Sequence, residues 1–202
     1  MQVSEAALGL FAEYLELGGE NQTIDGDDRR SLRYFVVELA YRAGRTADEH
    51  RQRIVDWVES LLQFESFTDR EGRLPRENNR LPREAISDEE RESAEWARYQ
   101  RRPSTRSQHC RYQTRRLEII PDFSWNPQED KWIAQFTDYF HFFDAHGAPA
   151  IRSRNPDERR RAAWAARQRL AHAKGTLPPA RSAKLEATRL WTWTTGAAPN
   201  AT

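Results

Sequence analysis

The sequence predicts an all-α protein made of two tandem three-helix units preceded by an N-terminal helical pair. Three observations predict this fold. Rare residues recur along the last three-quarters of the chain, large apolar residues follow helical spacing, and helix-start and helix-stop residues frame the segments. Hydrophobic residues make up 38% of the 202 positions and charged residues 31%, which suits small cores beneath a heavily solvated surface.

Residues 1–50 are expected to form an acidic helical pair, with helices over about 4–17 and 27–43. The run DGDD, which ends at Asp28, places carboxylates where the second helix would begin, at the positive end of its dipole. The stretch from Phe35 to Tyr41 is too apolar for an exposed helix, so the pair either packs on the following unit or dimerises. Because the segment has no counterpart in the repeat, its deletion is expected to leave a soluble two-unit core.

The repeat rests on five anchor residues. Trp57, Gly72, Trp96, Leu117 and Trp125 recur as Trp132, Gly147, Trp164, Leu185 and Trp193. The first two pairs are 75 residues apart and the other three are 68 apart, so one extra loop in the first unit, ENNRLPRE, accounts for the difference. The units therefore span 51–127 and 128–194, and the remaining residues 195–202 are expected to be a disordered tail.

Each unit is predicted to contain three helices. Large apolar residues follow steps of four, three and three at Trp57, Leu61, Phe64 and Phe67, and again at Trp132, Phe136, Tyr139 and Phe142. The expected helices cover about 51–68, 88–102 and 106–118, then about 129–145, 157–173 and 178–189. Ser87 and Asn155 stand before acidic residues, as N-caps of the middle helices would. We interpret the Trp residues as core anchors rather than as platforms for base stacking.

The segments WARYQRR…RRLEIIPDFSW and WAARQRLAHAKGTLPPARSAKLEATRLWTW resemble the helicase-associated domain. That domain is a small all-helical module, often in tandem, found beside bacterial helicase motors and in chains without one. The second unit carries nearly the whole pattern, including W-x-x-x-Q-R, K-G-x-L and a closing aromatic–x–Trp. The first unit lacks K-G-x-L and has Gln113 where the second has Arg181. The resemblance covers about 150 of the 202 residues, and it implies nucleic-acid binding.

The net charge of +1 conceals a division along the chain. Residues 1–50 hold five Arg against ten Asp and Glu, a net charge of −5, whereas residues 51–202 hold 27 Lys and Arg against 21 acids, a net charge of +6. The acidic segment could contact another protein or shield a basic face. Of the 32 basic residues 29 are Arg, which GC-rich coding would also produce. The planar guanidinium matches phosphate oxygens and guanine edges in either case.

Basic residues on the second and third helices and in one loop are the candidate contacts to nucleic acid: Arg73, Arg76, Arg98, Arg101, Arg111, Arg115, Arg116, Arg167, Arg169, Arg181 and Lys184. They predict binding of duplex DNA by phosphate neutralisation, with the third helix of each unit near a groove and Arg181 as the best candidate for a base contact. The alternative is a solvated surface paired with nearby acids. The Gln-Arg pairs ending at Arg101 and Arg169 could instead tie the middle helices to a loop carbonyl.

The sequence contains no recognisable catalytic motif. No G-x-x-x-x-G-K-[ST] loop occurs, which excludes a helicase motor in this sequence. His141, Asp144 and His146 have spacing that places the two His on different helix faces, and His109-Cys110 has no recognisable partner base. We therefore expect no metal, no cofactor and no enzymatic activity, but a DNA-binding accessory or regulatory protein. A protein–protein adaptor is the alternative, and an unrecognised small enzyme is the weaker third.

The chain has no run of about 18 apolar residues, so no transmembrane helix and no membrane partner are expected. Its first residues lack the basic start of a secretory signal. The single cysteine, Cys110, suits a reducing cytoplasm, which is the expected location. The oligomeric state does not follow from the sequence.

Overall fold

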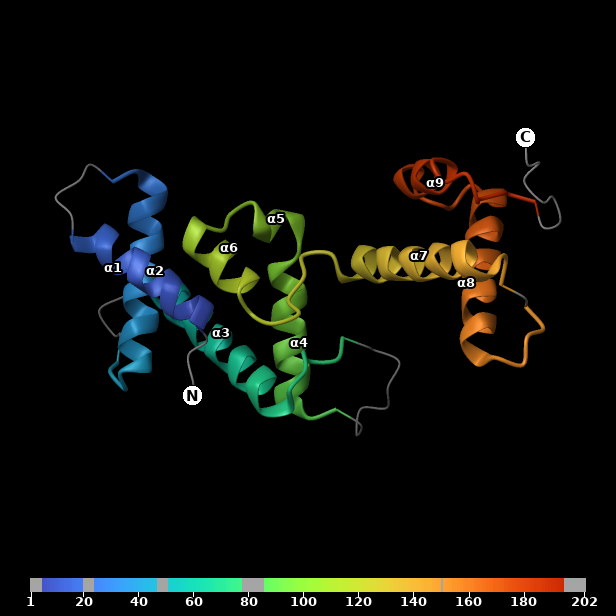
Figure 1. Cartoon of the computed structure of the whole chain (residues 1–202). Helices are drawn as coiled ribbons and strands as arrows, with labels where there is room; N and C mark the ends of the chain where they lie inside the picture. Colours follow the sequence, from blue (N-terminus) through green and yellow to red (C-terminus); the bar gives the residue numbers. More distant parts are fainter. Residues whose placement is uncertain (1–4, 20–23, 47–50, 78–85, 150, 195–202) are drawn as a thin grey trace. The chain divides into compact units, whose positions relative to one another are not determined.

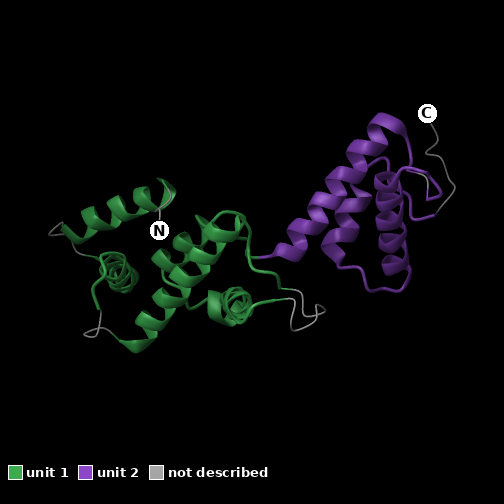
Figure 2. Ribbon diagram, turned by 90° about the horizontal axis from the view of Figure 1, so that it is seen from below, with its two compact units in different colours: residues 1–125 green, residues 126–202 purple. Residues whose placement is uncertain are grey.

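The computed structural model describes residues 5–19, 24–46, 51–77, 86–149 and 151–194 (Figure 1). These residues form α-helices joined by turns and loops, and no strand occurs among them, which confirms the predicted all-α class. They divide into two compact units, one over 1–125 and one over 126–202 (Figure 2). Nowhere in the described part of the chain is a helix long and apolar enough to cross a membrane.

The observed helices lie close to the predicted ones. The first unit contains α1 (Glu5–Gly19), α2 (Gly26–Arg42), α3 (Gln52–Glu71), α4 (Asp88–Gln100), α5 (Pro103–Arg106) and α6 (Arg111–Glu118). The second contains α7 (Pro127–His146), α8 (Pro156–Ala173) and α9 (Pro179–Glu186). The helix predicted over 106–118 is interrupted, because α5 ends at Arg106 and α6 begins only after Cys110. There the Gln113 side chain accepts a hydrogen bond from the Cys110 amide.

Short polar side chains begin the helices where the sequence indicated. Asp25 accepts a hydrogen bond from the Asp28 amide at 2.7 Å, so the acidic run does begin α2. Ser87 caps α4, accepting from the Glu90 amide at 3.1 Å, and Asn155 caps α8, accepting from the Asp157 amide at 2.9 Å. These bonds satisfy amides that have no partner inside the helix.

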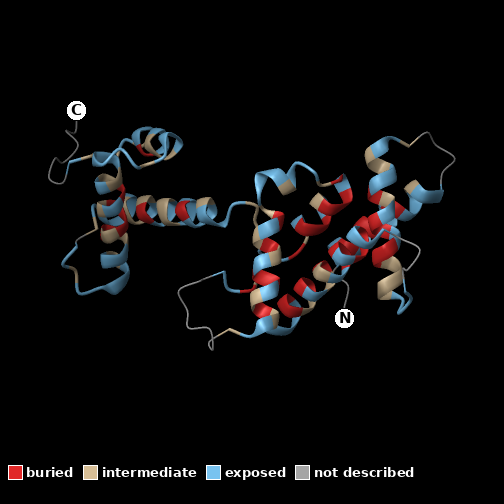
Figure 3. Cartoon of the chain, turned by 180° about the vertical axis from the view of Figure 1, so that it is seen from behind, coloured by how far each residue is buried: buried red, intermediate tan, exposed pale blue. Residues whose placement is uncertain are grey.

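The core of the first unit includes the N-terminal pair. Helix α2 packs against both α3 and α6, and α1 packs on α2. Buried positions concentrate where these helices cross (Figure 3). Tyr34 of α2 meets the Trp57 ring of α3 edge-on at 5.3 Å, and Tyr112 of α6 contacts the rings of Tyr14 and Phe35. Of the two alternatives for residues 1–50, the structure therefore shows packing on the following unit, and the predicted boundary after residue 50 does not separate compact units.

A buried ionic cluster joins α2, α3 and α6. The Arg116 guanidinium donates to Glu38 of α2 at 3.0 Å and to Glu65 of α3 at 2.5 Å, and its side chain is fully buried. Arg42 of α2 pairs with the same two carboxylates, and Tyr112 donates its hydroxyl to Glu38 at 2.9 Å. Buried charges are tolerated only when they are paired and hydrogen-bonded in this way.

The second unit has its own smaller core, built by α7, α8 and α9. Its buried members are mainly aromatic: Trp132, Tyr139, Trp164, Ala165, Leu185 and Trp191. Buried positions gather where α7 meets α8, and exposed positions cover much of the remaining helix surface (Figure 3).

The same contacts occur at repeat-related positions in the two units. The Trp57 indole donates to the Gln100 side-chain oxygen at 3.1 Å, and the Trp132 indole donates to that of Gln168 at 2.9 Å. Trp57 and Trp96 have ring centroids 6.0 Å apart, and the separation for Trp132 and Trp164 is 5.9 Å. The closing indoles of Trp125 and Trp193 donate to Glu118 and Glu186 respectively. These correspondences follow the offsets found in the sequence.

Candidate nucleic-acid interface

Three of the predicted basic residues have structural roles. Arg101 donates to the Ser124 carbonyl at 2.5 Å and lies over the Phe123 ring, while Arg169 donates to the Thr192 carbonyl at 2.8 Å and lies over Trp191. Both arginines tie a middle helix to the closing loop. The expectation that the two Gln-Arg pairs bind a loop carbonyl is therefore confirmed for Arg101 and Arg169. Arg116 is a correction to the predicted site, because its fully buried side chain cannot reach a phosphate.

The remaining predicted arginines of α6 face the acidic N-terminal pair. Arg111 lies 2.8 Å from Asp25 and 3.3 Å from Asp28, and Arg115 pairs with Glu13. These two arginines are only partly covered, with side chains 57% and 44% exposed. Carboxylates of α1 and of the start of α2 therefore offset the positive charge of Arg111 and Arg115.

The predicted loop residues surround one buried carboxylate. Arg73 pairs with Glu90 of α4 at 2.7 Å, and the Arg76 amide donates to the same carboxylate at 2.9 Å. The hydrogen bond from Arg73 is the main reason that the pKa of Glu90 lies below its ordinary value. Arg73 thus anchors the loop, whereas the Arg76 side chain stays exposed. Two further loop arginines, Arg80 and Arg83, lie outside the described residues.

The predicted residues of the second unit are more accessible. Arg167 is exposed and forms no ion pair with a described residue. Lys184 is exposed over the Phe136 ring, and Arg181 pairs with Glu129 at 2.7 Å while lying over the Trp132 ring. Arg181 therefore covers the face of Trp132, much as Tyr34 meets Trp57 in the first unit. Arg98 of α4 is half-buried and also lacks an ion pair with a described residue.

Positive charge accumulates on the second unit. Residues 126–202 hold twelve Lys and Arg against seven Asp and Glu, a net charge of +5, whereas residues 1–125 hold 20 against 24, a net charge of −4. Seven exposed cations of the second unit form no ion pair with any described residue: Lys131, Arg152, Arg154, Arg167, Lys174, Lys184 and Arg189. Unpaired cations are available to phosphates without first losing an internal partner.

The first unit holds a second basic region that sequence reasoning missed. Arg30, Arg33, Arg51 and Arg53 line a pocket of about 280 Å³ together with Tyr34 and Ile54. The runs RRSLR and RQR are visible in the sequence. The net negative charge of residues 1–50 conceals the positive charge that Arg30 and Arg33 contribute locally.

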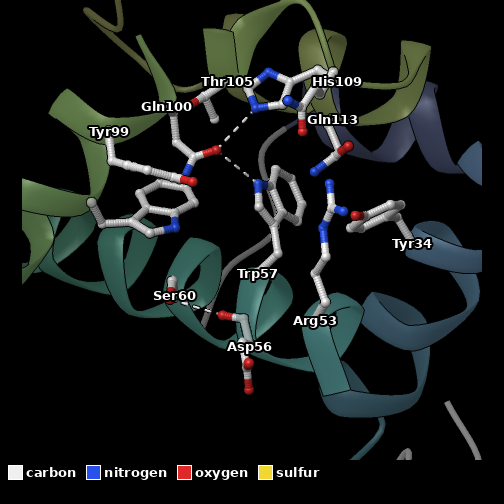
Figure 4. Close-up of a pocket in the computed structure, with 12 residues that line it drawn as sticks. Tyr34, Arg53, Asp56, Trp57, Ser60, Tyr99, Gln100, Thr105, His109 and Gln113 are labelled. Atoms are coloured by element: carbon white, nitrogen blue, oxygen red, sulfur yellow. Dashed lines mark hydrogen bonds between the residues drawn. The ribbon is translucent and has the colours of Figure 1, made fainter. Parts of the chain in front are cut away.

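A larger pocket of about 520 Å³ adjoins this region, sharing Tyr34 and Arg53 (Figure 4). Helices α3 and α4 and the α5–α6 turn form its other walls. Gln100 lies at its centre, where its side-chain oxygen accepts from the Trp57 indole and lies 3.0 Å from His109 Nε2. Burial, with the nearby positive charge of Arg106 as the next cause, lowers the pKa of His109 to about 4. The imidazole is therefore neutral at pH 7, with its proton placed on Nε2 toward Gln100.

No group of three His, Cys, Asp or Glu side chains in the described segments is arranged to hold a metal ion. Cys110, the N-cap residue of α6, is fully buried. Comparison of the chain with family models, curated proteins and solved structures found no match in any of the three.

Proposed function

We propose that this protein is a non-catalytic accessory or regulatory factor of the cytoplasm that binds nucleic acid, with double-stranded DNA favoured. The second unit supplies the main phosphate contacts. The observation that carries the proposal is its net charge of +5 together with seven exposed cations that have no ion-pair partner among the described residues. In the first unit, by contrast, the basic face of α6 is neutralised by Asp25, Asp28 and Glu13.

We further propose that α3, α4 and α6 form one copy of a three-helix module and that α7, α8 and α9 form another. The paired indole–amide hydrogen bonds support this, as do the two Arg-to-carbonyl bonds at matching positions. The resemblance to tandem helicase-associated domains gives the module its expected role. In this proposal the first copy has acquired the helical pair α1–α2 as a cover, and the second has kept a solvated basic surface.

The mechanism is neutralisation of backbone phosphates with release of condensed counterions. Exposed Arg and Lys side chains reach phosphate oxygens without a fixed base partner, so binding is expected to depend strongly on salt and weakly on sequence. Arg181 contributes less than the sequence suggested, because its guanidinium already pairs with Glu129.

Fluorescence anisotropy with a labelled random duplex tests the proposal. Log affinity is expected to fall against log salt concentration with a slope that becomes shallower by about 0.9 for each phosphate contact removed. The triple variant Arg167→Gln, Lys184→Gln, Arg189→Gln should flatten the slope by roughly 2 to 3 and weaken binding. The matched pair Arg111→Gln, Arg115→Gln should leave the slope unchanged. Equal effects of the two sets, or absence of duplex binding at low salt, would contradict the proposal.

A protein–protein adaptor is the second candidate, and one observation favours it. Leu8 and Leu15 of α1 are 55% and 57% exposed and stand seven residues apart, so they share a helix face with the exposed Ala12. An exposed apolar stripe of this kind suits a partner protein. The variant Leu8→Ser, Leu15→Ser should leave duplex binding unchanged and should abolish association with any partner that docks on α1.

A further inference from the structure

The two adjoining pockets of the first unit combine aromatic rings with a concentration of arginine. Their volumes, about 520 and 280 Å³, lie in or near the range of small-molecule sites. The larger pocket is walled by Trp57, Trp96 and Tyr99, and the smaller one by four arginines. Arg53 stands between them with its guanidinium near Tyr34 and Gln113 (Figure 4).

The aromatic side of the site is accessible. The Tyr99 side chain belongs to a residue that is 51% exposed, and Trp96 is half-buried. Trp57 is buried, its ring centroid lies 6.0 Å from that of Trp96, and its indole is held in place by a hydrogen bond to Gln100. The pocket thus offers aromatic surface on a rigid floor, which is suited to stacking a planar group.

Few acidic side chains offset the positive charge on the arginine side of the site. Arg33, Arg51 and Arg53 form no ion pair with a described residue, and Arg30 donates to the Gln108 carbonyl at 2.6 Å. Asp56 is the one carboxylate among the described lining residues, and it already accepts from Gln52 at 2.7 Å. The region is therefore positive, and the four arginines that line it offer guanidinium donors that suit an anion.

The second unit lacks the equivalent lining, although it keeps the same scaffold. By the offset of 68, Leu177 stands where the first unit has His109, Arg167 replaces Tyr99, and Arg181 replaces Gln113. Arg181 lies over the Trp132 ring at 5.2 Å and so occupies the space above the indole. The pocket is thus a property of the first unit rather than a consequence of the three-helix scaffold.

We propose that this site binds a nucleoside phosphate, with the base against Trp96 and Tyr99 and the phosphate on Arg30, Arg33 and Arg53. A nucleoside phosphate uses both halves of the site, whereas an uncharged aromatic molecule or inorganic phosphate uses only one. Gln113 and Ser60 are polar residues in the lining of the larger pocket. The ligand comes either from a free mononucleotide or from the phosphorylated end of a single strand. This function goes beyond duplex binding and does not depend on the second unit.

Titration of the full chain with the four nucleoside monophosphates, followed by tryptophan fluorescence and by calorimetry, tests the proposal. Adenosine and inorganic phosphate serve as half-ligands, and a 5′-phosphorylated single-stranded trinucleotide represents a strand end. Nucleoside monophosphates or the trinucleotide should bind at least tenfold more tightly than either half-ligand, which corresponds to about 1.4 kcal/mol. Binding of the monophosphates identifies a free nucleotide as the source, and binding of the trinucleotide alone identifies a strand end.

Variants in the pocket locate the site. Arg33→Gln and Arg53→Gln should each weaken binding roughly tenfold, as expected for a lost charge-assisted contact. Arg29→Gln, which lies on α2 with Arg33 but outside the pocket lining, is the matched control and should leave binding unchanged. Tyr99→Ala should weaken binding through lost stacking. Gln113→Arg places the residue of the second unit in the pocket and should abolish binding. If this buried change prevents folding, the exposed Arg33 and Arg53 variants still decide.

Three results would overturn the proposal: no binding of any nucleotide or of the trinucleotide, equal binding of adenosine, or binding that survives the Arg33→Gln, Arg53→Gln double variant. None of these results would affect the separate proposal that the second unit binds duplex DNA with a strong dependence on salt. Conversely, loss of duplex binding in the Arg167, Lys184, Arg189 variant leaves nucleotide binding intact, so failures of the two proposals are distinguishable.

Discussion

Arg116 and Lys184 occupy matching positions in the repeat but have opposite environments. Arg116 is buried with Glu38 and Glu65, whereas Lys184 is exposed over the Phe136 ring. The two residues are both basic, but their positive charges have different roles. One guanidinium balances buried carboxylates inside the core, and the other cation remains available to solvent or to a phosphate.

Replacing Arg116 with Met should destabilise the first unit by roughly 3–5 kcal/mol, because it leaves the buried carboxylates of Glu38 and Glu65 with Arg42 as their one remaining cationic partner among the described residues. Lys184→Met should change stability by less than about 1 kcal/mol and should reduce duplex affinity instead. Urea unfolding and anisotropy on both variants measure the two effects. A small stability change for Arg116→Met would show that the buried cluster does not hold α2, α3 and α6 together.

His109 is expected to make the first unit sensitive to acid. Its folded-state pKa of about 4 lies below the ordinary value of 6.5, with burial as the main cause and Arg106, Arg30 and Arg53 as contributors. Between these values the unfolded chain binds a proton that the folded chain does not, so stability falls as the pH falls from about 6.5 toward 4. The loss should be on the order of 1–3 kcal/mol. The His109→Leu variant, which carries the residue of the second unit, should lack this part of the pH dependence in chemical unfolding.

At the scale of elements, the N-terminal pair is a structural part of the first unit. Val37 of α2 is fully buried, and Ile54 and Val58 of α3 lie in the same cluster. The second unit has Glu129 and the exposed Ile133 at the positions of Ile54 and Val58, with Arg181 paired to Glu129. Its surface is therefore adapted to solvent, and it needs no helical cover.

Deleting residues 1–50 should unfold the first unit, in contrast to the soluble two-unit core expected from the sequence. The deletion exposes Ile54, Val58 and Tyr112 and leaves Arg116 with only Glu65 as a partner. Two-dimensional NMR of the truncated chain should retain dispersed signals from residues 126–202 and lose those of the first unit. Retention of both sets would mean that α1 and α2 are dispensable for folding.

Most helices could be predicted because helical spacing and capping depend on residues that are close in the chain. Ser87 and Asn155 indicate their helices within a few positions. The environment of each arginine could not be predicted in this way, since its partner lies far away in sequence. Arg116 is 78 residues from Glu38, and Arg115 is 102 from Glu13. The arginine pocket was missed for a related reason, because its residues come from segments predicted as separate.

At the scale of the whole chain, each unit closes its own hydrophobic core. The cores also differ in composition. The first includes aliphatic residues from α2 and α3, and the second depends on a few aromatic rings. Trp164 contacts Trp132, Tyr139 and Trp191 in that smaller core. Loss of one of these rings should therefore remove a large part of the packing contacts in the core of the second unit.

Trp164→Ala should cost roughly 3–5 kcal/mol, which is enough to unfold a small helical unit. Since the cores are separate, the first unit should keep its stability. Thermal unfolding followed by calorimetry should show loss of one transition and preservation of the other, together with loss of duplex binding. A single transition that shifts as a whole would indicate that the two units unfold cooperatively.

The indole–amide hydrogen bonds limit how the sequence can diverge. Trp57 and Gln100 are 43 residues apart, and Trp132 and Gln168 are 36 apart, yet each pair shares one buried bond. A change at the Gln alone leaves a buried indole N–H without an acceptor, while a joint change to Phe and an apolar residue removes donor and acceptor together. Substitutions at the two positions should therefore be correlated among descendants of this chain, and Trp without Gln should be the rarer combination.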